Sequence, residues 1–327
     1  MPSAIDRAEQ AAAKDLARLG SPDELERLAL EPEDVERPAS GSRPACVLRD
    51  DRGRRYFFKS APRDLVAAEI LAYDVRHLGG RAAIATAARA IELPGLGLVS
   101  GMLQPFVPHA GERLPGDPRA WTELQREVML REHPWEWLLA NLDTHVDQYV
   151  LFGPDRVPLD VDWDHALLDL HIETLDRFTK RSPAIVPIRN ALYDAYARGD
   201  VALGFEGMRR QLRQIARLDD RKLRASLEAW AERAGVAGPE KRDTIARFFR
   251  RKRTMSRTFR AFVRGLRRER LLRRLPSQPL PFAERVWTAA RDGWQRLIID
   301  EAHDRIVVPW LRAYRRVLEV KATLRRD

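Results

Sequence analysis

The sequence contains a single cysteine among its 327 residues, Cys46. One cysteine excludes a disulfide framework and also a zinc site built from several cysteines. Long apolar runs are missing too, because no window reaches the roughly 18 consecutive apolar residues of a membrane span. The first residues lack the basic stretch and apolar core of a secretory signal peptide. We therefore expect a cytoplasmic protein.

Lysine is scarce as well, since seven of the 58 basic residues are lysines and the other 51 are arginines. The net charge is +10, and thirteen basic residues against one acid lie between Arg247 and Arg274, a local charge of +12. The rest of the chain is therefore near −2, which is 10 minus 12. The positive charge is therefore concentrated in one segment. Because lysine is rare in this chain, a lysine at an unusual position is a candidate functional residue.

Apolar spacing and turn residues predict an α+β fold, with a small β-rich lobe followed by a larger helical lobe. We expect two short helices within 5–30, a loop at 31–42, a hairpin at 43–59, a helix at 63–78 and short strands at 82–107. From residue 118 onward the pattern is helical, apart from an acidic hairpin at 143–166. The expected regions are N-terminal helices at 1–36, a small lobe at 37–107, a larger lobe at 108–238 and a basic helical extension at 239–327.

Two charged residues of the small lobe are candidates for a phosphate site. Lys59 ends a strand after two phenylalanines and would place a compact ammonium group near nucleotide phosphates. The alternative is an edge-strand lysine in water. Glu69 is the one acid in the apolar centre of the helix at 63–78, and a buried carboxylate needs a partner. Lys59 is a plausible partner, whereas an exposed helix face would leave Glu69 in water.

Small residues precede the first strand of the hairpin at Ser40, Gly41 and Ser42. They would let backbone N–H groups approach phosphates, although a plain flexible loop has the same composition.

The acidic hairpin carries the largest group of candidate residues. Asp143 would orient an acceptor hydroxyl, and the amide oxygen of Gln148 would bind a metal, although an Asx-rich turn that caps a helix has the same residues. Asp160, Asp162 and Asp164 alternate, so on one strand they would share a face and repel each other unless a cation lies among them. A strand edge in water is the alternative. Asp162 is the preferred magnesium ligand.

A strand lysine, a helix glutamate, an acidic loop and a strand-end aspartate follow one another along the chain. In this order they resemble the atypical kinases of the phosphatidylinositol 3-/4-kinase-like group and the bacterial HipA-like kinases, over roughly residues 37–170. Those kinases carry an Asp-x-His-x-x-Asn catalytic loop and an Asp-Phe-Gly-like strand end. Here the loop reads Asp143-Thr-His145-Val-Asp-Gln148, and the strand end reads Asp162-Trp-Asp-His. The strand end is also similar to that of aminoglycoside-type small-molecule kinases.

The resemblance implies a two-lobed protein-kinase-like fold that uses ATP and Mg²⁺. It implies Asp143 and His145 as catalytic residues, Gln148 and Asp162 as metal ligands, and Lys59 as the ATP lysine with Glu69 as its partner. The segment 102–106 looks like the hinge that meets adenine, with Gln104 and Phe106 as contacts. The implied activity is transfer of the γ-phosphate to a hydroxyl of a protein, a lipid or a small molecule.

Two positions depart from the family pattern. Gln148 replaces the asparagine with a longer amide, for which Asp147 could compensate, and Asp164 replaces the glycine and adds charge. These departures leave open a catalytically inactive pseudokinase that serves as a basic binding module. A metallohydrolase that uses Asp143, His145 and Asp147 as metal ligands is a third interpretation.

The basic segment 247–274 has an apolar stripe at Met255, Phe259, Phe262 and Leu266, which is typical of an amphipathic helix. Such a helix could lie on an anionic membrane surface or bind nucleic acid. Alternatively, the stripe packs on the larger lobe and the arginines remain solvated.

Overall fold

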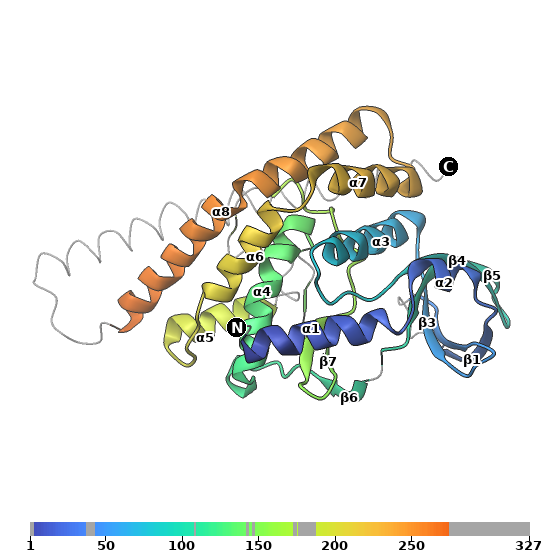
Figure 1. Cartoon of the computed structure of the whole chain (residues 1–327), viewed down its shortest axis with the longest axis horizontal. Coiled ribbons are helices and arrows are strands. Elements are labelled where there is room, and N and C mark those ends of the chain that lie inside the picture. The colour runs from blue at the N-terminus through green and yellow to red at the C-terminus, as the bar shows by residue number, and fades with distance from the viewer. Residues whose placement is uncertain are drawn as a thin grey trace, which may run out of the picture. The chain divides into compact units, whose positions relative to one another are not determined.

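The computed structural model describes residues 3–36, 43–107, 109–141, 144–145, 148–172, 175 and 188–274. The chain divides into two compact units, 1–274 and 275–327, and every described residue lies in the first. That unit holds a small antiparallel sheet and a larger helical part (Figure 1), which confirms the α+β class and its order of lobes. Within the described ranges, no helix is long and apolar enough to cross a membrane.

The sheet lobe contains five strands in the order β1-β2-β3-β5-β4, and all neighbouring strands are antiparallel. Their bounds are Glu31–Glu36 for β1, Ala45–Arg49 for β2, Arg55–Ser60 for β3, Ala87–Leu93 for β4 and Gly97–Pro105 for β5. Burial alternates along β2 and β3, so that one face packs into a core. β3 lies between β2 and β5, and therefore Lys59 is not on an edge strand.

Most elements predicted for this lobe are confirmed. The two short helices are α1 (Ala4–Ala17) and α2 (Pro22–Arg27), and α2 begins with the capping box of Ser21 and Glu24. The hairpin is β2 and β3, and the helix expected at 63–78 is α3 (Arg63–Leu78).

The loop predicted at 31–36 is wrong, because this segment forms the edge strand β1. It pairs with β2 from Glu31 opposite Arg49 to Glu36 opposite Ala45, with an irregularity after Pro32. An edge strand needs ladder hydrogen bonds on one side only, so a proline and several acids are compatible with it. The other half of that loop, 37–42, lies outside the described residues.

The helical lobe is built around α4 (Glu123–Leu139), whose Trp135 and Trp137 are buried in the largest core cluster. α4 begins with a capping box of Thr122 and Gln125 and ends at Ala140, which has a positive φ of 53°. The other helices are α5 (Ile188–Arg198), α6 (Glu206–Ala216), α7 (Asp220–Ala234) and α8 (Gly238–Arg274), with a 3₁₀ turn η1 at Pro118–Ala120. A three-stranded sheet of β6 (His109–Arg113), β7 (Tyr149–Phe152) and β8 (Val157–Asp160) contains the predicted acidic hairpin.

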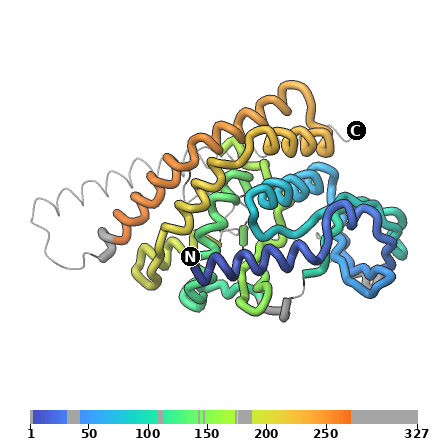
Figure 2. The backbone as a smooth tube through the Cα atoms, in the orientation of Figure 1, coloured from blue at the N-terminus to red at the C-terminus, as the bar shows by residue number. Residues whose placement is uncertain are grey.

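The apolar stripe of α8 packs on the helical lobe. Met255, Phe259 and Leu266 are buried, and Phe262 meets Tyr193 with a distance of 5.0 Å between ring centroids. α8 contacts α4, α5 and α6, and Figure 2 shows its backbone beside that of α6. Of the interpretations of this stripe, packing on the lobe is confirmed, so these residues are not available for insertion into a bilayer.

A buried ion-pair cluster ties α1, α3 and α4 together. Glu132 of α4 accepts hydrogen bonds from Arg76 of α3, at 2.6 Å, and from Arg81. Arg81 also pairs with Glu9 of α1 at 2.7 Å. Burial alone would raise the pKa of Glu132, but the two arginines outweigh burial and hold the pKa below its usual range. The carboxylate therefore remains charged between two buried guanidinium groups.

Replacing Glu132 with alanine should leave Arg76 and Arg81 buried without this partner. We expect the free energy of unfolding to fall by about 3–5 kcal/mol, because an uncompensated buried charge is costly. Urea unfolding measures the change. As a control, Asp15→Ala removes an exposed pair with Arg18 and should cost about 1 kcal/mol or less. Similar small losses in both variants would contradict a structural role for the buried cluster.

Candidate active site

Lys59 connects the two lobes. Its Nζ atom lies 3.0 Å from Asp162 Oδ2 and 3.2 Å from Asp164 Oδ2, so one ammonium group lies between two carboxylates. Arg43 adds a longer contact of 3.4 Å to Asp164. Burial alone would lower the pKa of Lys59, but the two aspartates outweigh burial and raise it. The structure thus brings together the sequence-predicted lysine and the predicted metal ligand Asp162.

Glu69 is buried on α3 but has other partners than Lys59. Its Oε1 accepts a hydrogen bond of 3.0 Å from the Gln104 amide, and its Oε2 accepts one of 2.6 Å from the backbone N–H of Trp163. Further along α3, the Arg76 guanidinium lies 4.3 Å from the centre of the Trp163 ring. α3 therefore holds Trp163 at two points, and Trp163 lies between Asp162 and Asp164 in the sequence.

The charge of Glu69 is altered by its surroundings. Burial raises its pKa to about 8, and the negative charges of Asp162 and Asp164 act in the same direction. The Trp163 N–H group and Lys59 oppose this shift without overcoming it. Its surroundings therefore favour the neutral form of Glu69, which acts as a hydrogen-bonding residue, while Asp162 and Asp164 are the carboxylates that contact Lys59.

The three alternating aspartates do not share one strand face. β8 ends at Asp160, and Asp162 and Asp164 follow in the segment after it, so that part of the prediction is wrong. Asp160 is buried, its Oδ1 accepts the backbone N–H of Asp162 at 3.1 Å, and burial raises its pKa well above the usual range. Asp160 thus shapes the strand end, while the other two carboxylates meet at Lys59.

The described part of the acidic loop is held by Gln148. The Gln148 Oε1 atom accepts a hydrogen bond of 3.0 Å from the backbone N–H of His145, and the backbone N–H of Gln148 donates to the His145 carbonyl at 3.1 Å. The amide oxygen has a second lone pair, so a role as metal ligand is compatible with the first of these bonds. Asp143 and Asp147 lie outside the described residues, as do Ser40, Gly41 and Ser42.

The two expected hinge residues lie at the end of β5 and just beyond it. The Gln104 amide points toward Glu69 and also donates to Thr86 Oγ1 at 3.0 Å, so it is committed inside the sheet lobe. The Arg55 guanidinium lies 4.4 Å from the centre of the Phe106 ring.

Sequence reasoning missed Asn141, Trp163 and Arg76. Asn141 is fully buried, and its amide nitrogen donates to the Asp162 carbonyl at 3.4 Å. Its Oδ1 is buried and has no hydrogen-bond partner among the described residues. The position of Asn141 directly before the acidic loop was the available signal.

The donors at this site fit magnesium. Carboxylate and amide oxygens are the ligands that Mg²⁺ takes from proteins, beside water and substrate phosphates. Asp162 and Asp164 supply carboxylates already held close together, and the unsatisfied Oδ1 of Asn141 belongs to a side chain bonded to the Asp162 backbone. The Asp162 side chain keeps 28% of its surface exposed, which leaves it accessible to solutes.

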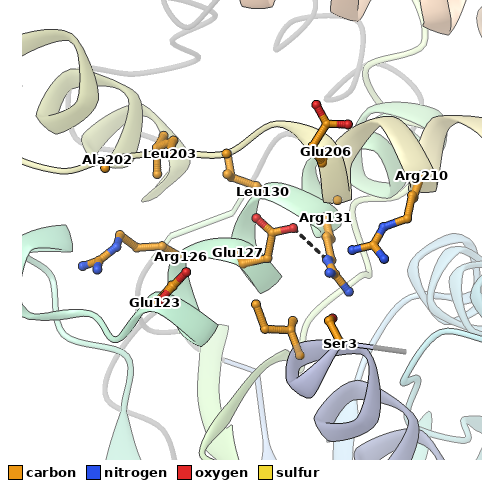
Figure 3. Close-up of a pocket in the computed structure, with 13 residues that line it drawn as sticks. Ser3, Glu123, Arg126, Glu127, Leu130, Arg131, Ala202, Leu203, Glu206 and Arg210 are labelled. Atoms are coloured by element: carbon orange, nitrogen blue, oxygen red, sulfur yellow. Dashed lines mark hydrogen bonds and ion pairs between the residues drawn. The ribbon is translucent and has the colours of Figure 1, made fainter. Parts of the chain in front are cut away.

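A separate cavity of about 220 Å³ lies among α1, α4 and the start of α6 (Figure 3). Glu127 and Arg131 form an ion pair of 3.0 Å beside it, and Arg210 pairs with Asp6 at 3.0 Å. None of the sequence-predicted site residues lines this cavity, and two of its lining arginines, Arg131 and Arg210, pair with Asp6 of α1. Its charges therefore serve the packing of α1 on the helical lobe.

No protein-family model matches the sequence, and no curated protein is significantly similar to it. Two solved kinase structures are similar in fold. One is a proinflammatory kinase of Helicobacter pylori, CtkA, with 12% identity and a TM-score of 0.46 over 70% of this chain and 93% of that chain. The other is the Golgi casein kinase, with 11% identity and a TM-score of 0.47 over 76% of this chain and 75% of that chain. At this distance the chemistry must be argued from the residues of the chain itself.

The raised pKa of Glu69 predicts a pH-dependent stability. The folded chain keeps this proton up to about pH 8, whereas the unfolded chain releases it near 4.5, so Glu69 stabilises the fold most below 4.5 and loses that contribution as the pH rises through 8. Glu69→Gln removes the titrating carboxyl group. The variant can keep the hydrogen bonds to Trp163 and Gln104 if the Gln104 amide rotates so that its oxygen faces residue 69. The difference in free energy of unfolding between the variant and the wild type should therefore shift in favour of the variant between pH 5 and pH 8. Urea unfolding without nucleotide or metal measures this, and parallel pH profiles would contradict the shift.

Proposed function

We propose that the protein is a phosphotransferase that uses ATP and Mg²⁺ to phosphorylate a hydroxyl group. The observation that carries the proposal is the contact of Lys59 in the sheet lobe with Asp162 and Asp164 of the helical lobe. Phosphoryl transfer depends on positioning and on neutralising phosphate charge, and a lysine facing metal-binding carboxylates supplies both. The order of these residues along the chain and their placement in two lobes support the same conclusion.

Each residue would have a distinct role. Lys59 would contact phosphate oxygens, and Asp162 would bind the metal, with Asp164 as a second carboxylate beside it. Glu69 would position the strand end through its bond to Trp163 and so act at a distance from the nucleotide. When bound, Mg-ATP supplies the phosphoryl group and the positive charge that offsets the phosphates.

The acidic loop would supply the group that meets the acceptor. Asp143 would orient the attacking hydroxyl, with His145 beside it, as the family motif implies. Gln148 remains a predicted metal ligand, and Asp164 is a second candidate for that contact because its carboxylate meets Lys59 beside that of Asp162. Ser40, Gly41 and Ser42 remain proposed phosphate contacts.

Adenine would meet the chain near the end of β5. Because the Gln104 side chain is engaged with Glu69 and Thr86, backbone groups near Gln104 and Phe106 are the better candidates for adenine contacts. The acceptor class is a protein, a lipid headgroup or a small molecule, since fold does not choose among them.

A pseudokinase is the second candidate function. The observation that favours it is the hydrogen bond that holds the Gln148 amide oxygen on the backbone of its own loop, because in an active kinase an oxygen of this loop must reach the second metal ion. Such a protein would still bind nucleotide but would show no transfer.

Asp143→Ala tests the proposed chemistry. We expect phosphoryl transfer to fall about a hundredfold or more, because a positioned carboxylate contributes at least that factor. Affinity for Mg-ATP should be almost unchanged, since Asp143 would face the acceptor. Release of radiolabelled phosphate from ATP, with water as the acceptor, and transfer to a panel of hydroxyl compounds measure the activity.

Asp155→Ala, at an exposed position of the turn between β7 and β8, is the matched control and should retain activity. Undiminished activity in Asp143→Ala would refute the role of that residue. Nucleotide binding by the wild type without any turnover would favour the pseudokinase.

A further inference from the structure

A groove of about 440 Å³ runs between α6 and α8, which lie side by side (Figures 1 and 2). Its floor is apolar and consists of Phe205, Met208, Leu212, Phe259 and Val263. Met208 and Phe259 form the base of the floor and are each only 1% exposed, and Val263 supplies its partly exposed apolar surface.

The rim of the groove is basic. Among the described residues, five arginines line it, namely Arg209, Arg257, Arg260, Arg264 and Arg267, and no carboxylate does. Arg257 and Arg264 are exposed, and neither pairs with an acid among the described residues. Arg209 pairs with Glu206, and Arg267 lies 5.6 Å from the centre of the Phe205 ring. The groove therefore offers positive charge that the part of the chain described by the structure leaves largely uncompensated.

We propose that this groove binds an amphipathic helix of a partner protein that carries Asp and Glu beside its apolar face. A groove between two helices accepts a third helix, whose apolar side chains at positions i, i+3 or i+4, and i+7 reach the floor. Arg257 and Arg267 are ten residues apart on α8, which is about 15 Å at 1.5 Å per residue. This length matches nearly three turns of a bound helix and several of its carboxylates.

Other anionic partners use only part of this surface. A membrane-bound helix needs apolar side chains that project toward the bilayer, whereas here they lie below the arginines. Nucleic acid would pair its phosphates with the arginines but would leave the apolar floor unused. A helix with an apolar face and acidic flanks matches both the floor and the rim.

The test uses the full-length protein and a synthetic, fluorescently labelled peptide of about 18 residues, with leucines on one helical face and glutamates beside them. A second peptide has the same composition but spreads the leucines around the helix. Fluorescence anisotropy measures both affinities. We expect the first peptide to bind at least about tenfold more tightly than the second.

Three variants locate the binding site. Arg257→Glu combined with Arg264→Glu reverses the rim charge, and Val263→Trp fills the groove without changing charge. Each should weaken binding of the first peptide by about tenfold or more. Arg253→Glu combined with Arg268→Glu is the matched control, because both residues are exposed on α8 and neither lines the groove. The control should change the affinity less than about threefold. Thermal unfolding verifies that every variant is folded.

Absence of peptide binding by the wild type would overturn the proposal, and so would equal losses in the rim and control variants. The same variants are also tested on vesicles containing phosphatidylserine and on a duplex oligonucleotide. If either of these probes binds through the rim arginines and the peptide does not, the groove belongs to that class of partner and the proposal is wrong.

Discussion

The attachment of α3 to Trp163 is the contact on which the candidate site depends. Glu69 accepts the backbone N–H of Trp163, and Arg76 lies over the ring of the same residue. Because Asp162 and Asp164 flank Trp163, these two contacts fix both carboxylates relative to the sheet lobe. Lys59 can then meet both carboxylates, so the arrangement of these three charged groups depends on the position of Trp163.

The charged groups around Trp163 largely compensate one another. Burial raises the pKa of Glu69 and so favours its neutral form, which limits the negative charge beside the two aspartates. Arg76 is neutralised on its other side by Glu132, in the buried cluster that also holds Arg81 and α1. Lys59 and Arg43 face Asp162 and Asp164, which leaves the site close to balanced. A nucleotide and its metal would bring their own opposite charges to this balanced group.

The sequence was sufficient to predict the order of the lobes and to single out Lys59, Glu69 and Asp162, because each had a local signal. Lys59 was a rare lysine in a strand, Glu69 was a single acid among apolar helix positions, and Asp162 stood at the end of an expected strand. The expected partner of Lys59 was Glu69, whereas Lys59 contacts Asp162 and Asp164. The partners of Glu69 were missed because Trp163 lies 94 residues away along the chain. Arg76 had no distinguishing signal in a chain this rich in arginine. The edge strand β1 was missed because its formation depends on backbone pairing with β2 and not on an apolar pattern.

If Lys59, Asp162 and Asp164 form a nucleotide site, ATP should bind the protein in a magnesium-dependent way, and calorimetric titration of ATP with and without magnesium measures this. We expect magnesium-dependent binding by the wild type, loss of that dependence in Asp162→Ala and retention in the control Asp155→Ala. No binding by the folded wild-type protein would show that these residues do not form such a site, and so would equal magnesium-dependent binding by the wild type and Asp162→Ala.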